Sequence, residues 1–581
     1  MATIDKFDFS INSLGDIRSL KHYNTMVGEN WPVVYVLNND DEAYVGETVN
    51  AARRTEQHLA NSAKQKLTEI RIITDKDFNK SVVLDLESYL IKHMGADGKY
   101  TLLNGNNGIQ DHDYYERSAY EDKFRTIWNK LRKLGVVDNS IEDIENSELY
   151  KYSPYKSLGS EQFHAEMEIL QALEEYRNDE NGCRIIVTGG AGTGKTILAI
   201  YLMKLFADIN SKGISEPDAD DYLDEDLEVV YAAERIDGIN KIGIVFPQKS
   251  LRSSLKDVFR GIKSLDPAMV LDTTDVVKNY LKTKEKYDLL IVDEAHRLKC
   301  RNKGHLSFYG KFDQCNRDLG LDKMTGTELD WIYKCSRNQI IFRDDLQTIR
   351  PCDIDAADFR EITEKRYPGT VIRQALSTQW RCLGGNGYID YLREIMSGTA
   401  KKYRKVENYD FRLYDDVGRM VADIKKLDAD MGLCRTAAGY AWEWKTNPKN
   451  KKYKGKKNLF DIIIGDNKFK WNSTYDNWIT SKNAVNEIGC IHTVQGYDLN
   501  YLGVIIGEDI KYSPLTQQIY ADKNCYFDQQ GKSGVADDPE ALREYLLNIY
   551  ITLMTRGIRG TYVYVCDPAL RKYMAQFIDK A

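Results

Sequence analysis

The sequence predicts an α/β protein in which a small αβ domain precedes two larger lobes built on parallel sheets. Three observations carry this prediction. At Cys183–Phe206 an apolar run leads through GGAGTGKT into a helical pattern. Within Tyr287–Lys299 a second apolar run is followed directly by two carboxylates. Short strand and helix patterns also alternate between Trp31 and Tyr115. Such alternation is typical of sheets that are covered by helices.

The segment GGAGTGKT follows a strand and begins a helix, as a phosphate-binding loop requires. Gly189, Gly192 and Gly194 let the backbone turn so that successive N–H groups converge on a triphosphate, beside the positive end of the helix. Lys195 can reach the β- and γ-phosphates, and the Thr196 hydroxyl suits Mg²⁺. The alternative is a glycine-rich turn without a nucleotide. The complete pattern favours a nucleotide site.

The segment YDLLIVDEAHRLK places Asp293 and Glu294 directly after four apolar residues. A buried parallel strand would deliver both carboxylates to the sheet edge beside the phosphate loop. We expect Asp293 to hold Mg²⁺ through water and Glu294 to polarise the attacking water. A DEAH tetrapeptide can arise by chance, but its position after GKT on an apolar strand favours a functional pair.

Length and composition predict a multidomain protein without a membrane span. The chain has 581 residues, for which about two to four domains are expected. It contains no run of about 18 apolar residues, and its N-terminus has no apolar signal core, so we expect a cytoplasmic protein without a membrane span. Ten cysteines without a C-x-x-C pair indicate reduced thiols. A net charge of -7 argues against a uniformly basic coat but allows a local basic channel.

Changes in pattern divide the chain into five parts. We expect an N-terminal extension (1–30), the small αβ domain (31–115), a charged helical connector (116–160) and two lobes (161–382 and 383–581). The lysine-rich segment Asn447–Lys457 in the second lobe is either a solvated loop or a phosphate contact.

The small domain carries polar residues in a fixed order: Tyr35, Tyr44, Arg54, His58, Glu87 and Asn104. Arg54 and His58 are four residues apart on a helix that we expect to follow an Asn50 N-cap, so they share one face. From Trp31 to Tyr115 the chain resembles the GIY-YIG nuclease family, which includes phage-intron homing endonucleases and a subunit of bacterial excision repair. The first triad here is Val-Val-Tyr rather than Gly-Ile-Tyr.

The resemblance implies single-metal hydrolysis of a phosphodiester. By the match, Glu87 holds the divalent ion and Arg54 steadies the charged phosphate. Tyr35, Tyr44 and His58 would activate or orient the attacking water. Two alternatives stay open. Asn107 could take the place of Asn104, and the domain could keep the fold without the activity.

Further residues resemble motifs of superfamily 1 helicases. By that resemblance Gln162 reads the adenine edge, which favours ATP over GTP, and Gln347 senses the γ-phosphate. Arg381 and Arg556 would act on the phosphates from the second lobe, so that hydrolysis senses closure of the lobes. The alternative for Arg381 is an ordinary surface arginine.

Other segments resemble helicase motifs that contact nucleic acid or couple the lobes. Gln248, Lys249 and Ser250 match the motif that holds the nucleic-acid backbone independently of sequence. Thr493, Gln495 and Gly496 fall at a strand-to-helix turn of the second lobe. As a whole, Gln162–Ala581 resembles a bacterial family of helicase-like ATPases related to the helicase domain of Schlafen proteins, which implies two RecA-like lobes.

These patterns support three hypotheses. The favoured one is an ATP-driven motor that carries a Mg²⁺-dependent endonuclease and acts on DNA, with RNA open, in DNA processing or anti-phage defence. A homo-oligomer or a partner protein of a defence system is compatible with it. The second hypothesis is an ATP-gated nuclease or assembly switch without translocation. The third is a nuclease regulated by a degenerate motor, against which the intact Asp293, Glu294, Arg381 and Arg556 argue.

Overall fold

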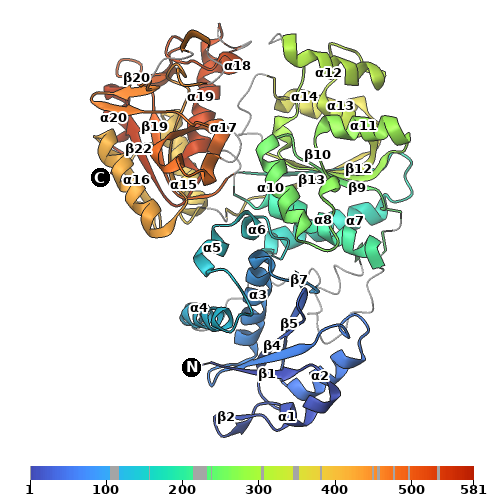
Figure 1. The fold of residues 1–581 in the computed structure, drawn as a ribbon. Helices are drawn as coiled ribbons and strands as arrows, with labels where there is room; N and C mark the ends of the chain where they lie inside the picture. The colour runs from blue at the N-terminus through green and yellow to red at the C-terminus, as the bar shows by residue number, and fades with distance from the viewer. Residues whose placement is uncertain are drawn as a thin grey trace. The chain divides into compact units, whose positions relative to one another are not determined.

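The fold comes from a computed structural model (Figure 1). It describes residues 2–104, 117–155, 158–190, 192–212, 232–233, 235–236, 238–301, 306–344, 352–379, 382–447, 451–453, 458–474, 478–494, 497–532, 535 and 537–581. The chain forms two compact units. One comprises residues 1–177, 196–244 and 253–270, and the other comprises residues 178–195, 245–252 and 271–581.

The N-terminal domain is built on a five-stranded sheet with the order β1-β6-β4-β5-β7. Its strands are β1 (Thr3–Asp8), β4 (Val33–Asn38), β5 (Glu42–Thr48), β6 (Glu69–Thr74) and β7 (Thr101–Leu102). Helix α2 (Ala51–Ala60) follows β5, and α3 (Lys80–Asp97) follows β6. Asn50 caps α2 as expected, because its side chain accepts a hydrogen bond from the Arg53 N–H at 2.9 Å.

Residues 1–30, expected as an extension, contribute a strand to this sheet. Strand β1 pairs antiparallel with β6 along its whole length. Its sequence, TIDKFD, carries charges on an edge strand, where they discourage pairing with another chain. Its place in the sheet therefore depends on backbone pairing, which hydrophobic periodicity does not reveal. The small elements α1 (Leu14–Arg18), β2 (Lys21–His22) and β3 (Thr25–Met26) follow.

The helical connector belongs to the same core. It comprises α4 (Arg117–Lys133), α5 (Ile141–Glu145) and α6 (Glu148–Lys151). Phe124 and Trp128 of α4 are buried in one cluster with Val82 and Leu86 of α3. The connector is thus packed onto α3 rather than forming a separate spacer.

A six-stranded sheet with the order β10-β9-β11-β12-β8-β13 forms the first lobe. Its strands are β8 (Cys183–Gly189), β9 (Ile242–Val245), β10 (Val270–Leu271), β11 (Tyr287–Val292), β12 (Ser336–Arg343) and β13 (Thr370–Leu376). β12 pairs parallel with β11 and β8, and β13 pairs parallel with β8. The helices are α7 (Ser160–Glu175), α8 (Lys195–Lys212), α10 (Lys249–Arg260), α11 (Thr273–Thr283), α12 (Leu306–Asp318), α13 (Glu328–Cys335) and α14 (Ala356–Glu361).

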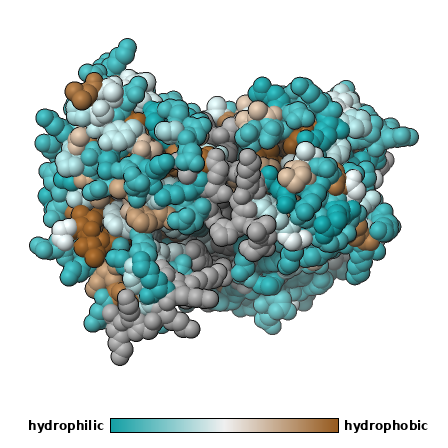
Figure 2. All heavy atoms as spheres, turned by 90° about the horizontal axis from the view of Figure 1, so that it is seen from above, coloured by the Kyte–Doolittle hydropathy of each residue, from teal (hydrophilic) through white to brown (hydrophobic). Residues whose placement is uncertain are grey.

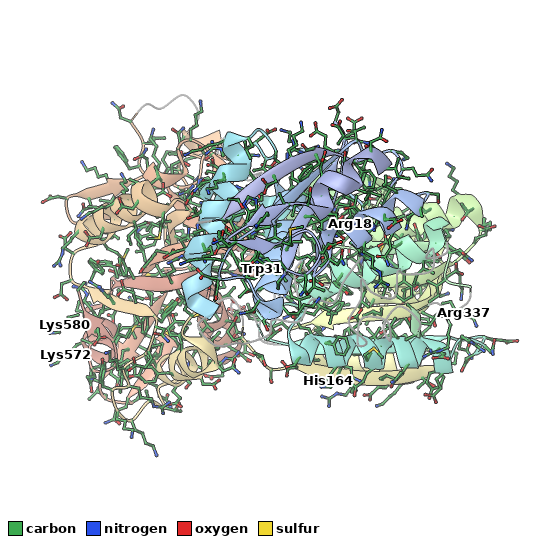
Figure 3. The ribbon with its side chains drawn as sticks, turned by 90° about the horizontal axis from the view of Figure 1, so that it is seen from below. Arg18, Trp31, His164, Arg337, Lys572 and Lys580 are labelled. Carbon is green, nitrogen blue, oxygen red and sulfur yellow. The ribbon has the colours of Figure 1, made fainter. Side chains whose placement is uncertain are left out.

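Buried apolar runs such as Ile185–Val187 and Leu289–Val292 explain this sheet, because parallel strands are covered on both faces. Arg337 in β12, labelled in Figure 3, donates from Nη2 to the carbonyl oxygen of Asp179 at 2.8 Å. This bond ties β12 to the turn that leads into β8.

The second lobe has a six-stranded sheet with the order β18-β15-β19-β22-β14-β23. Its strands are β14 (Asp410–Tyr414), β15 (Cys434–Ala438), β18 (Ile488–Cys490), β19 (Leu499–Ile506), β22 (Gly557–Val565) and β23 (Asp579–Lys580). All five neighbouring pairs are parallel. The helices are α15 (Gly385–Ser397), α16 (Val417–Met431), α17 (Ile491–Val494), α18 (Gln529–Lys532), α19 (Pro539–Met554) and α20 (Pro568–Met574). A hairpin is formed by β20 (Ile510–Ser513) and β21 (Gln518–Ala521). The predicted fold class is confirmed.

Surface and thiol features agree with the composition. The face drawn in Figure 2 is mostly hydrophilic, with apolar side chains in scattered spots. No helix within the described residues is both long and apolar enough to cross a membrane. All ten cysteines are described, and each is a free thiol.

Candidate active sites

The phosphate loop connects β8 to α8. Gly192 and Gly194 both have φ of 82°, a backbone conformation that favours glycine. Lys195 is 5% exposed, and its Nζ donates to the carbonyl oxygens of Gly189 and Gly190 at 2.6 and 2.7 Å. Its ammonium group is therefore at the mouth of the loop, where a phosphate would meet it. Thr196 is the second residue of α8.

Two carboxylates follow β11, as expected. Asp293 is fully buried, and its N–H donates to the Val245 carbonyl at 3.0 Å. Glu294 has φ of 53°, a left-handed conformation that is unusual for a residue with a side chain. Such local strain is concentrated at functional sites, where the surrounding structure maintains it.

His296 connects Glu294 to the end of β12. Its Nδ1 accepts a hydrogen bond from the Asp344 N–H at 3.4 Å, and its Nε2 lies 3.1 Å from Oε2 of Glu294. Because Nδ1 accepts, the ring carries a proton on Nε2, the nitrogen that faces the Glu294 carboxylate. Asp344 Oδ2 in turn lies 4.0 Å from Nζ of Lys195. His296 and Asp344 were not predicted as site residues from the sequence, although the DEAH segment contains the histidine.

Arg556 lies between α19 and β22 and is 2% exposed. Burial acts to raise the pKa of the Glu294 carboxyl, but His296, Lys195 and Arg556 together outweigh burial and hold that pKa below its usual value. Glu294 is thus a carboxylate surrounded by cationic and donor groups. An arginine from the second lobe contributes to that environment.

Five residues for which the sequence predicts a role lie outside the part of the chain that the structure describes. They are Gln347, Arg381, Gln495, Gly496 and Asn107.

Two expected residues take part in local caps. The side-chain oxygen of Gln162 accepts the Gly159 N–H at 2.9 Å and so caps α7. Thr493 accepts the Cys490 N–H at 2.9 Å. Both therefore have structural tasks, and their roles toward a nucleotide or between the lobes stay predictions.

A polar hollow occurs near the motif expected to hold nucleic acid. It is lined by Pro247, Gln248, Lys249, Arg297, Lys299, Asp353 and His492. Three of these side chains are cationic and one is a carboxylate, so the hollow suits a phosphate backbone. Gln248 and Lys249 were expected here. Arg297 and Lys299 were not, although they directly follow DEAH in the sequence.

A second hollow borders the phosphate loop. Gly190, Thr193 and Asp344 line it together with Asn386, Asp390 and Arg393 of α15. Arg393 lies 3.8 Å from Asp390 through Nη1 and Oδ1. Arg393 is therefore an arginine of the second lobe on the nucleotide side that the sequence analysis did not single out.

The N-terminal domain assembles its predicted residues around Tyr35. Tyr35 Oη lies 2.7 Å from Nε2 of His58 and accepts a hydrogen bond from Nε of Arg54 at 3.4 Å. Tyr35 comes from β4, whereas Arg54 and His58 come from one face of α2. Burial raises the pKa of the Tyr35 phenol, and the Arg54 guanidinium acts against that rise. Strand and helix thus bring together residues that are 23 positions apart.

Strand β5 completes this face. The ring of Tyr44 lies 5.3 Å from the ring of His58. Gly46 is required beside Tyr35, because a Cβ at this position would overlap the Tyr35 phenol. Asn104 accepts from the Val45 N–H at 3.0 Å and donates to the Val45 carbonyl at 2.7 Å. Asn104 therefore clamps β5, which is a structural role.

Glu87 of α3 is the predicted metal ligand. Burial and the neighbouring carboxylate of Glu47 raise its pKa to about 8, and the Glu47 N–H donates to it. Glu47 follows Gly46 in β5 and forms an ion pair with Lys80 through Oε1, whereas its Oε2 is buried without a hydrogen-bond partner among the described residues. Glu47 was not predicted as a site residue, because a single carboxylate after Gly46 forms no recognisable sequence motif.

Two family profiles and one curated relative match this chain. A family profile described as Schlafen group 3, DNA/RNA helicase domain matches residues 183–567, and one described as GIY-YIG catalytic domain matches residues 32–101. An uncharacterized protein of Saccharomyces cerevisiae, YPL245W, is 24% identical over 429 residues, which cover 69% of this chain and 86% of the yeast protein.

Two solved structures are more distant from this chain. Pif1 helicase from Candida albicans shares 11% identity with a TM-score of 0.22, covering 47% of this chain and 55% of the helicase. A DEAD box protein from Methanococcus jannaschii shares 10% identity with a TM-score of 0.21, covering 70% and 87%. The chain thus spans about half the length of the Candida protein. Likeness at this level carries no argument about activity.

Proposed function

This chain belongs to the Schlafen group 3 DNA/RNA helicase family, and from that premise we propose that it is an ATP-driven nucleic-acid motor with a metal-dependent endonuclease at its N-terminus. The observation that carries the proposal is the environment of Glu294. The backbone of Glu294 has a left-handed conformation. Lys195 of the phosphate loop and Arg556 of the second lobe both act to lower the pKa of its carboxyl.

In the proposed ATP reaction, Lys195 binds the β- and γ-phosphates and stabilises charge that develops on them. Glu294 orients the attacking water, and the His296 ring, with Nε2 at 3.1 Å from Oε2, keeps the carboxylate in place. Arg556 neutralises charge from the second lobe, Arg393 is a further arginine of that lobe, and Arg381 stands in the sequence at the hinge between the two lobes. Hydrolysis then requires that the lobes approach one another, so turnover is coupled to their movement.

The donor sets fit Mg²⁺ at both sites. Asp293 and Thr196 offer a carboxylate and a hydroxyl, which are the hard oxygen ligands that Mg²⁺ prefers. In the nuclease domain Glu87 and Glu47 offer two buried carboxyls, of which the Glu47 Oε2 lacks a hydrogen-bond partner within the described residues. A bound cation would neutralise this pair and polarise a phosphate oxygen.

The nuclease residues would then act on one phosphodiester. Arg54 steadies the phosphate charge, and Tyr35, Tyr44 and His58 orient the attacking water, His58 through its contact with Tyr35. Nucleic acid would be held by the hollow lined by Lys249, among other residues. The nuclease, being tethered to the motor, would act at high effective concentration.

The substrate that we favour is DNA, because the GIY-YIG resemblance implies DNA cleavage, and the setting that we favour is DNA processing or anti-phage defence in the cytoplasm. A homo-oligomer or a defence partner fits the same proposal. RNA is the alternative that the following assay distinguishes.

Purified protein is incubated with labelled single- and double-stranded DNA and RNA, with and without ATP and Mg²⁺. Lys195→Ala should abolish ATP turnover, with the exposed Lys286→Ala as its control. Arg54→Ala should abolish cleavage and leave ATP turnover intact, with the exposed neighbour Arg53→Ala as its control.

Full activity in Lys195→Ala would exclude an ATP-dependent role. Wild-type cleavage in both Arg54→Ala and Glu87→Ala would exclude the nuclease assignment. ATP turnover without directional unwinding would favour the alternative of an ATP-gated nuclease or assembly switch.

A further inference from the structure

Lys64 is a buried lysine in the nuclease domain that the sequence motifs do not include. It lies in the turn that follows α2 and is 7% exposed. Backbone hydrogen bonds fix this turn, because the Lys64 N–H donates to the Asn61 carbonyl at 3.1 Å and the Leu67 N–H donates to the Lys64 carbonyl at 3.0 Å. The turn therefore presents the side chain in a defined direction.

The ammonium of Lys64 contacts two of the residues expected at the active site. Its Nζ lies 3.0 Å from Nδ1 of His58 and 3.6 Å from the centre of the Tyr44 ring. The second contact is a cation–π interaction at short range. A lysine is rarely buried unless partners compensate it, so both contacts account for its position.

The chemistry of these contacts determines the state of His58. An ammonium group has three donors and no acceptor, so Nδ1 of His58 must accept its hydrogen bond. The neutral imidazole then carries its proton on Nε2, which lies 2.7 Å from Tyr35 Oη. The phenolic oxygen consequently accepts from Nε2 of His58 as well as from Nε of Arg54.

We propose that Lys64 is a positioning residue that fixes His58 as the Nε2–H tautomer, so that His58 donates to Tyr35 and does not act as the base. Tyr35 then accepts from both His58 and Arg54, which leaves its own O–H as a donor to a third group. This inference rests on the proposed nuclease function for its consequence in cleavage, but the tautomer itself can be observed in a protein that cleaves nothing.

The electrostatics agree with this arrangement. Burial lowers the pKa of His58 most, and Lys64 and Arg54 lower it further, to about 2. The groups that face the imidazole are Lys64, Arg54, Tyr35 and Tyr44. Two of the four are cations, so the imidazole is neutral at physiological pH.

The test uses the full chain with ¹⁵N-labelled histidine. The chain has eight histidines, and the His58 signals are assigned by their loss in His58→Gln. Wild type should show an unprotonated Nδ1 and a protonated Nε2. Lys64→Met removes the donor at similar length and should give a mixture of tautomers, whereas Lys64→Arg should restore the Nε2–H form.

Cleavage supplies the second readout. Lys64→Met should lower the cleavage rate by about 10- to 100-fold, as the loss of a residue that orients a site group does, and should leave ATP turnover unchanged. Lys64→Arg should recover most of the rate. Lys66→Met in the same turn is the matched control, because Lys66 is 63% exposed and lies 3.4 Å from Glu42.

The outcomes separate the two proposals. A protonated Nδ1 in wild type, or an unchanged tautomer in folded Lys64→Met, would overturn the role of Lys64 whatever the protein cleaves. An Nε2–H tautomer that depends on Lys64, in a wild-type protein without cleavage, would overturn the nuclease function and leave the positioning role intact.

Discussion

Nε2 of His296 lies 3.1 Å from Oε2 of Glu294, while Nδ1 of the same ring accepts the Asp344 N–H. One imidazole thus joins the carboxylate after β11 to the residue that follows β12. Asp344 also lies 4.0 Å from Lys195, so the phosphate loop, the carboxylate and the end of β12 form one connected set. A change at one of these groups should be transmitted to the other two.

The first prediction concerns this link. His296→Ala removes the ring that lies 3.1 Å from Oε2 of Glu294, so the carboxylate should lose its orientation toward the attacking water. We expect ATP turnover to fall on the order of 10²-fold, because misplacement of a reacting group by about 1 Å has this effect. Steady-state ATPase assays measure the rate, and binding of a non-hydrolysable ATP analogue should be retained.

His164→Ala serves as the control for this variant. His164 is exposed on α7 and is labelled in Figure 3. Equal turnover in His296→Ala and His164→Ala would contradict the role of the link.

The second prediction concerns Gly46. A Cβ at this position would overlap Oη and Cζ of Tyr35, so Gly46→Ala should displace the phenol from His58 and Arg54. We expect cleavage to fall by about 10²-fold with little change in ATP turnover. Gly15→Ala in α1 is the control, because no atom lies within 4 Å of its added Cβ. Cleavage at the Gly15→Ala rate would show that Tyr35 is not needed where it lies.

Local patterns were sufficient to predict the fold class and both family resemblances. The phosphate loop, Asp293–Glu294 and the order Tyr35, Arg54, His58 are each encoded by spacing along a strand or one helix face. The comparisons confirm both resemblances. The roles of the individual residues stay predictions.

Contacts between distant segments could not be predicted in this way. Strand β1 joins the sheet through backbone pairing with β6, and the paired residues are 61 to 71 positions apart in the sequence. Three further site residues belong to no periodic pattern in the sequence. They are Lys64 in the turn after α2, Glu47 in strand β5 and Asp344 at the end of β12. Gln162 matches a nucleotide-reading motif, but in this structure its oxygen caps α7.

The third prediction concerns the metal ligands of the nuclease. Glu47→Gln keeps the size of the side chain but removes one of two carboxyls that would share a cation. We expect the Mg²⁺ concentration for half-maximal cleavage to rise by about 10-fold, with the maximal rate approached at high Mg²⁺. A Mg²⁺ titration of cleavage measures this shift, and the exposed Glu56→Gln on α2 is the control. An unchanged midpoint would remove Glu47 from the ligand set.

The last prediction concerns the stability of the second lobe as a function of pH. Asp509 is fully buried after β19, and its Oδ1 accepts a hydrogen bond from Tyr550 Oη at 2.6 Å. Burial raises its pKa from 3.8 to about 7, although the Tyr550 hydroxyl and the N–H groups of Asp509 and Ile510 act in the opposite direction. Between pH 3.8 and about 7, Asp509 is therefore protonated in the folded lobe but ionised in the unfolded chain.

Because the folded state binds more protons in this window, the free energy of unfolding should fall as the pH rises from about 4 to about 7, by up to about 1.4 kcal/mol per pH unit. Asp509→Asn keeps the acceptor for Tyr550 without an ionisable group, so it should be more stable than wild type at pH 7 and of similar stability at pH 4. Thermal unfolding of both proteins at pH 4, 5, 6, 7 and 8 measures the difference. Tyr550→Phe removes a donor that stabilises the ionised form of Asp509, so the fall in the free energy of unfolding should extend to higher pH. A difference in stability between wild type and Asp509→Asn that is the same at every pH would contradict the burial of an ionisable Asp509.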